Sequence, residues 1–133
     1  GKTAAFSENI GHTYNTLGFY DKAERYFDEA LRLVRNGANP DSNEGGILLG
    51  LAGVQERRDA LKEALPTSIQ AYEYFKKRDK RHGWGSSLTA KAAMQLSKVY
   101  LRLGRLEEAE SSVREAEHLF VETAGPESPL LVG

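Results

Sequence analysis

The sequence predicts an all-α fold, an α–α superhelix (solenoid) of three helix-turn-helix repeats. Small, aromatic and turn-forming residues recur at a constant separation of 86 positions, as Ala23 and Ala109 do. A weaker copy lies between them, at offsets of 41 and then 45 residues. A period of this length indicates stacked helix pairs, each packing on its neighbours. The residues that recur over the long offset are Ile10, Gly11, Tyr14, Leu17, Gly18, Ala23, Phe27, Ala30 and Pro40.

The first repeat spans about residues 3–38. Its first helix carries an apolar stripe that ends at Gly18, and a second stripe follows directly after that glycine. Gly11, Ala23 and Ala30 are small, as required where two helices approach closely, and Phe27 fills the space between them. The pattern predicts an antiparallel pair of helices joined by a tight turn.

The second repeat, about residues 44–81, departs most from this pattern. Asp59 and Leu61 stand where the first repeat has its turn glycine and an aromatic residue, which favours a longer and looser turn. Pro66 falls where the second helix should already be running, and proline in a helix interior costs about 3 kcal/mol. Either the helix begins near Pro66 or it kinks there.

The third repeat, about residues 86–124, again follows the first closely. We expect residues 125–133 to form a linker and the start of a truncated fourth repeat, because Ser128 and Pro129 are typical of the first residues of a helix. We therefore expect a single domain over residues 1–133 that is an excerpt of a longer protein.

The small and aromatic residues at these intervals resemble the tetratricopeptide repeat, a helix-turn-helix family. The resemblance covers almost the whole chain. The late prolines, in Asn39-Pro40-Asp41-Ser42 and Gly125-Pro126-Glu127-Ser128, resemble the long repeats of the kinesin-light-chain-like branch. The resemblance implies a non-enzymatic scaffold that binds a peptide or helix of a partner protein in a concave groove, lined by the first helix of each repeat.

Helical geometry then selects the side chains that face this groove. Stepping outward from the buried face of each first helix places one set of residues from each repeat on the concave side. The predicted partner-binding residues are Glu8, His12 and Asn15 in the first repeat, Gly46, Leu49, Gly50, Gly53 and Glu56 in the second, and Lys91, Met94, Lys98, Leu101 and Arg102 in the third.

The three glycines in this set form a stripe with two explanations. Gly46, Gly50 and Gly53 share one helix face, and each costs about 1 kcal/mol relative to alanine. One explanation is that a ligand lies against the bare helix there. The other is structural: a neighbouring helix packs closely on the glycines, or the helix begins later in the chain.

The composition is that of an ordinary soluble domain with unevenly spread charge. The net charge is −1, and 40% of the residues are hydrophobic. Residues 67–105 contain nine Lys and Arg residues and two acidic residues, whereas residues 106–133 contain seven glutamates and one arginine. There is no cysteine, which excludes a disulfide framework and a thiolate metal site, and no apolar run is long enough for a membrane helix. We expect an intracellular, cytoplasmic protein without a membrane partner.

Catalysis, metals and cofactors find no support in the residue pattern. His12, His82 and His118 fall in separate segments without a nucleophile at triad spacing. Glu115, His118 and Glu122 share a helix face, but a fourth metal ligand is not evident. The cationic run at 76–82 lacks interleaved aromatic residues, so we do not expect a nucleic-acid partner.

The sequence thus predicts binding of a protein segment that carries acidic and apolar residues. The cations of the third repeat would set the register of the bound segment, and Met94 and Leu101 would contact its apolar residues. The second hypothesis is an assembly module that self-associates through uncapped ends or outer faces.

Overall fold

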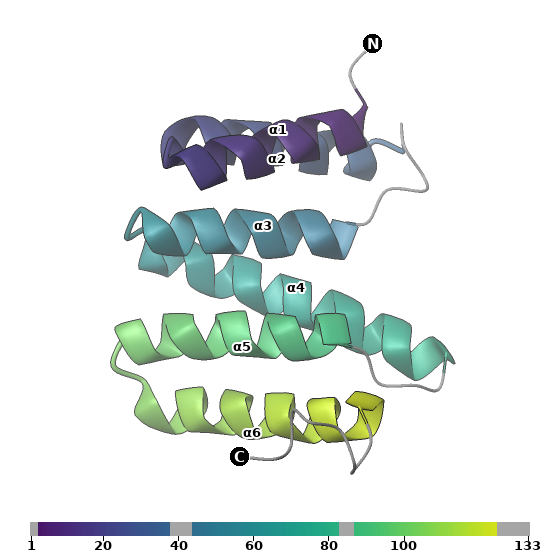
Figure 1. The fold of residues 1–133 in the computed structure, drawn as a ribbon, viewed down its shortest axis with the longest axis vertical. Helices are drawn as coiled ribbons and strands as arrows, with labels where there is room; N and C mark the ends of the chain where they lie inside the picture. Colours follow the sequence, from purple (N-terminus) through teal and green to yellow (C-terminus); the bar gives the residue numbers. More distant parts are fainter. Residues whose placement is uncertain (1–2, 38–43, 83–86, 125–133) are drawn as a thin grey trace. The chain divides into compact units, whose positions relative to one another are not determined.

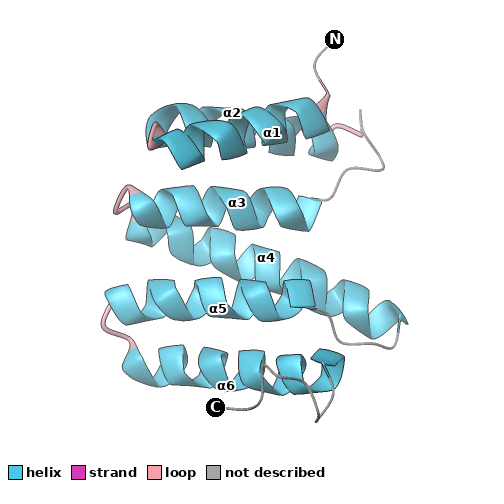
Figure 2. Cartoon of the chain, viewed as in Figure 1, coloured by secondary structure: helices cyan, strands magenta, loops and turns pink. Residues whose placement is uncertain are grey.

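The computed structural model describes residues 3–37, 44–82 and 87–124, and every regular element in these ranges is an α-helix (Figures 1 and 2). The all-α helical-repeat fold predicted from the sequence is therefore confirmed. The predicted linkers and the truncated fourth repeat lie outside the described residues. In chain order the helices are α1 (Ala4–Leu17), α2 (Tyr20–Arg35), α3 (Glu44–Arg57), α4 (Leu61–His82), α5 (Ser87–Arg102) and α6 (Leu106–Ala124).

The chain divides into two compact units, an N-terminal unit of residues 1–71 and a C-terminal unit of residues 72–133. Helix α4 contributes its first part to one unit and its second part to the other. Each unit contains an antiparallel helix pair closed by a short turn, α1 with α2 and α5 with α6 (Figure 1).

Helix α1 has signals at both ends. Thr3 precedes its first residue, and the Thr3 hydroxyl accepts a hydrogen bond from the backbone N–H of Phe6 at 3.1 Å. After Leu17 the chain turns at Gly18, whose φ of 86° lies in the left-handed region that glycine adopts without a Cβ clash. Because α1 stops there, α2 can begin two residues later and pack back against it.

The same turn closes the first helix of all three repeats. Gly18, Asp59 and Gly104 have φ values of 86°, 64° and 79°. In each turn the next residue donates its N–H to the carbonyl oxygen five residues back, at Phe19, Ala60 and Arg105, with N–O distances of 2.9, 2.8 and 2.8 Å. The prediction of a longer, looser turn at Asp59 is therefore wrong, since aspartate adopts the glycine conformation there.

Helix α4 also corrects an expectation. It begins at Leu61 and runs without interruption to His82, so Pro66 lies inside it and the alternative that the helix begins near Pro66 is wrong. Pro66 is exposed, and in the same stretch the Thr67 hydroxyl donates to the Glu63 carbonyl oxygen at 3.0 Å. The helix tolerates proline within its second turn, where only one backbone hydrogen bond is lost.

The core of the N-terminal unit is built around Phe27 of α2. Its side chain is fully buried, and the ring lies over Gly11 of α1, where an added Cβ would come within 3.2 Å of the ring carbons. A larger residue at position 11 would push the two helices apart. The residues of this core are Ala4, Ala23, Phe27, Ala30, Ile47, Leu51 and Val54.

In the C-terminal unit, polar contacts tie the second part of α4 to its neighbours. The Tyr72 hydroxyl donates to Oε1 of Glu115 in α6 at 3.1 Å, and burial is the main cause that raises the pKa of Tyr72. The Thr89 hydroxyl of α5 donates to the buried carboxylate of Asp79. Tyr72 therefore stays a neutral donor at physiological pH, and the two contacts help to hold α4 against both α5 and α6.

Replacing Asp59 with glycine should stabilise the protein by about 0.5 to 1 kcal/mol, because glycine removes the steric penalty of the left-handed conformation. The matched control is Gly104→Asp, which places aspartate in the equivalent turn and should destabilise the protein by a similar amount. Urea unfolding of both variants measures the two changes. A loss of stability in Asp59→Gly would show that the aspartate side chain has a stabilising role of its own.

Candidate functional site

The most exposed part of the predicted site is a row of side chains on α5. Lys91, Met94, Lys98 and Leu101 follow one another at three or four residues, so they share a helix face, and Arg102 lies beside them. All five are exposed, with 37% of Met94 and 59% of Leu101 accessible to solvent. Among the described residues neither Lys91 nor Lys98 has an ion-pair partner. We call this row the α5 face.

The predicted residues of α1 differ in exposure. His12 is exposed, whereas Glu8 and Asn15 are half-buried. The His12 Nε2 lies 3.4 Å from Oε2 of Glu8, and its ring meets the Phe27 ring edge-on at a centroid distance of 4.9 Å. The amide oxygen of Asn15 is buried and has no hydrogen-bond partner in the described part of the chain. His12 is therefore held against the core rather than projecting freely.

The predicted residues of α3 are all partly exposed, and its glycines fall into two kinds. A Cβ added at Gly50 would lie 2.7 and 2.8 Å from the Phe27 ring carbons Cε1 and Cζ, and 3.2 Å from Cε1 of His12. A Cβ added at Gly53 would meet no heavy atom within 4 Å. Close packing, one of the two explanations for the stripe, therefore accounts for Gly50 but not for Gly53. The five α3 residues are Gly46, Leu49, Gly50, Gly53 and Glu56.

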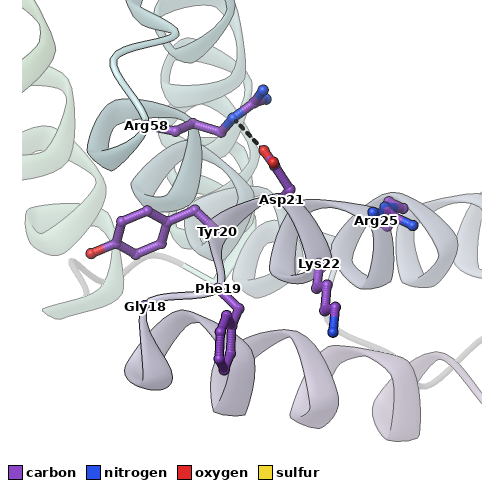
Figure 3. A pocket seen from close by; sticks show the side chains of 7 residues that line it. All are labelled: Gly18, Phe19, Tyr20, Asp21, Lys22, Arg25 and Arg58. Atoms are coloured by element: carbon purple, nitrogen blue, oxygen red, sulfur yellow. Dashed lines mark ion pairs between the residues drawn. The ribbon is translucent and has the colours of Figure 1, made fainter.

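A hollow that the sequence did not indicate lies at the turn between α1 and α2. Figure 3 shows that α2 supplies most of its wall and that Arg58, which directly follows α3, reaches in to meet Asp21. The hollow measures about 490 Å³. We call it the turn pocket, and its lining residues are Gly18, Phe19, Tyr20, Asp21, Lys22, Arg25 and Arg58.

The cations of the turn pocket differ in their partners. Arg58 is engaged, because its Nε lies 3.2 Å from Oδ1 of Asp21 and it also donates to Glu24. The negative charge of Glu24 makes the largest contribution to raising the pKa of Arg58. Lys22 lies over the Phe19 ring, with Nζ 5.5 Å from the centroid. In the described residues neither Lys22 nor Arg25 forms an ion pair.

Sequence reasoning missed the turn pocket because it considered only the first helix of each repeat. The available signal was a position-by-position comparison of the second helices. Lys22 corresponds to Glu63 in the second repeat and to Glu108 in the third, at the same offsets of 41 and 86 residues. Only the first repeat places a cation there.

The described residues also bear on metal ions and membranes. Among them, no group of three or more His, Asp and Glu side chains is arranged to hold a metal ion. Glu115, His118 and Glu122, which share a helix face in the sequence, were not expected to bind a metal, and the side chain of Glu122 lies outside the described set. No helix in the described ranges combines the length and apolar character that a membrane span requires.

Two models of known protein families together match most of the chain. A tetratricopeptide repeat model matches residues 2–77, more than half of the sequence, and a second tetratricopeptide repeat model matches residues 89–130. No curated protein matches the sequence.

The two kinds of glycine in α3 predict opposite responses to alanine. Gly50→Ala should destabilise the protein by about 1 to 3 kcal/mol, because the new methyl group collides with the buried Phe27 ring. Gly53→Ala should stabilise it by up to about 1 kcal/mol, because its Cβ enters open space and alanine favours the helix. Thermal unfolding of the two variants measures the difference, and equal melting temperatures would contradict the distinction.

Proposed function

This chain belongs to the tetratricopeptide repeat family, and we propose on that basis that it is an intracellular, non-enzymatic module that binds a segment of another protein. Tetratricopeptide repeats generally mediate protein–protein interactions. We assign the contacts to the exposed faces of the first helices, α1 and α3 in the N-terminal unit and α5 in the C-terminal unit.

The observation that supports this proposal best is the composition of the α5 face. Two lysines without ion-pair partners among the described residues alternate with Met94 and Leu101, two exposed apolar side chains. Such a row suits a partner segment in which acidic residues alternate with apolar ones. The lysines would orient the segment, and burial of Met94 and Leu101 would contribute most of the affinity.

The face of α1 and α3 supports a different kind of contact. Gly53 is open to solvent, so a partner's backbone can approach the helix closely at that point. Glu8 and Glu56 make the surroundings of Gly53 on this predicted face acidic. We therefore assign backbone contacts and donor side chains of the partner to this face.

We also propose that the repeats are of the long, kinesin-light-chain-like kind. Support comes from the offsets of 41 and 45 residues between equivalent positions, such as the three left-handed turn residues Gly18, Asp59 and Gly104.

Selection from a random peptide library tests the proposal. Peptides retained by the protein should be enriched in Asp or Glu next to Leu, Phe or Met. Their affinity should fall several-fold between about 0.05 and 0.5 M salt, because exposed ion pairs are screened over about 10 Å at 0.1 M. The double variant Lys91→Glu/Lys98→Glu should lose this enrichment, whereas Lys62→Glu, an exposed lysine on α4, should keep it.

Failure to enrich any peptide family would contradict the proposed function. Enrichment that is identical in the double variant and in the wild type would contradict the assignment to the α5 face.

The second candidate function is assembly of several copies. It is favoured by the outer face of α1, where 51% of Phe6 and 61% of Leu17 are exposed. Phe6 corresponds to Ile47 in the second repeat, at the offset of 41 residues, and Ile47 is fully buried. An apolar residue at this position is therefore normally covered by another helix.

If assembly is the function, the mass measured by gel filtration with light scattering should rise with concentration above the 14.7 kDa of one chain. The double variant Phe6→Ser/Leu17→Ser should then stay monomeric at every concentration. A wild-type mass that does not change with concentration would rule out this candidate.

A further inference from the structure

We infer that the turn pocket is a second contact site, which takes a carboxylate side chain of the partner together with an apolar side chain next to it in the partner's sequence. The inference rests on the proposed function, because it assumes that the ligand is a protein segment. It adds a contact on the second helix of a repeat, outside the faces of the first helices.

The charges that line the turn pocket favour an anionic ligand. The pocket is lined by three cations and one carboxylate, and Arg58 already pairs with that carboxylate, Asp21. Lys22 and Arg25 remain without an anionic partner among the described residues. An incoming carboxylate would supply that partner, so the pocket is complementary to an acidic residue.

Lys22 has an unfavourable position in the unbound protein. It lies in the first turn of α2, where the helix dipole disfavours a positive charge, and Arg25, three residues later, carries the same charge. Arg25 itself has Asp21 and Glu29 four residues away on either side. A carboxylate bound beside Lys22 would therefore offset an unfavourable charge at that position.

In the equivalent turn of the third repeat, the cation has an acidic partner within the turn itself. There Arg105 donates two hydrogen bonds to the carboxylate of Glu108, at 2.8 and 2.6 Å. The equivalent residues of the first repeat, 86 positions earlier, are Phe19 and Lys22. The first repeat has a lysine in place of this acid and an exposed aromatic ring in place of the arginine.

An exposed apolar surface lies beside these cations. Phe19 is 54% exposed although it packs against Tyr14 with a ring-centroid distance of 6.1 Å, and the neighbouring Leu17 is 61% exposed. Tyr14 meets the Phe19 ring edge-on, and the Nζ of Lys22 lies 5.5 and 5.6 Å from the centroids of the Phe19 and Tyr14 rings. An exposed ring beside two cations favours a leucine or an aromatic residue adjacent to the acidic one.

The size of the pocket agrees with this ligand. Its volume of about 490 Å³ falls within the range of roughly 300 to 1,000 Å³ that is typical of small-ligand sites. A pocket of this size accommodates one or two side chains of an extended peptide.

The test uses the full chain labelled with ¹⁵N and a short synthetic peptide in which glutamate and leucine alternate. A second peptide, with glutamine in place of glutamate, is the ligand control. NMR titration with the acidic peptide should shift the backbone amide signals of residues 18–25, and the glutamine peptide should not. The double variant Lys22→Glu/Arg25→Glu should weaken binding at this site roughly tenfold.

The matched protein control is Lys91→Glu/Lys98→Glu, which makes the same change of charge on α5. It should leave the shifts at residues 18–25 in place. Glutamate is compatible with the fold at position 22, because Glu63 and Glu108 occupy the equivalent positions. A melting temperature of the turn-pocket variant within a few degrees of the wild type, as expected for exposed substitutions, confirms that a loss of binding is not unfolding.

Three results would overturn the inference. The first is the absence of shifts at residues 18–25 with the acidic peptide. The second is binding that is lost in the α5 variant and kept in the turn-pocket variant, which would leave the proposed function intact and remove only the second site. The third is equal shifts with the glutamine peptide, because the carboxylate would then have no role.

Discussion

The packing of Phe27 between two glycines is the constraint on which the N-terminal unit depends. The ring belongs to α2, lies over Gly11 of α1 and occupies the space next to Gly50 of α3. One side chain therefore sets how closely three helices approach. Because protein interiors are packed as densely as crystals, neither glycine can be replaced by a larger residue without moving a helix. The positions of the faces of α1 and α3 follow from this contact.

This constraint separates residues that shape the fold from residues that are available to a partner. Gly50 lies against the Phe27 ring and is committed to packing, whereas His12 contacts the ring edge-on and is still exposed. Gly53, one helical turn further along, is open. The same separation holds among the cations, since Arg58 is paired with Asp21 and Glu24, whereas Lys22 has no acidic partner in the described residues.

The internal repeat was sufficient to predict the all-α fold, the helix pairs and the small residues at the helix contacts. It was not sufficient at Asp59, because the left-handed conformation is imposed by the hydrogen bonds of the turn and not by the preference of aspartate. Gly50 and Gly53 were indistinguishable in the sequence, since the ring that distinguishes them comes from another helix. The turn pocket was missed because the prediction was restricted to the first helix of each repeat, and because Arg58 joins residues 18–25 only through packing of α2 and α3.

A double-mutant cycle between Gly50 and Phe27 tests the central claim most directly. Gly50→Ala is measured once in the wild-type background and once in Phe27→Leu, which removes the ring carbons that the new methyl group would meet. We predict that most of the alanine penalty disappears in the leucine background, which corresponds to a coupling energy of about 1 kcal/mol or more. If the two substitutions are additive, the ring does not determine the distance between α2 and α3, and the account is wrong.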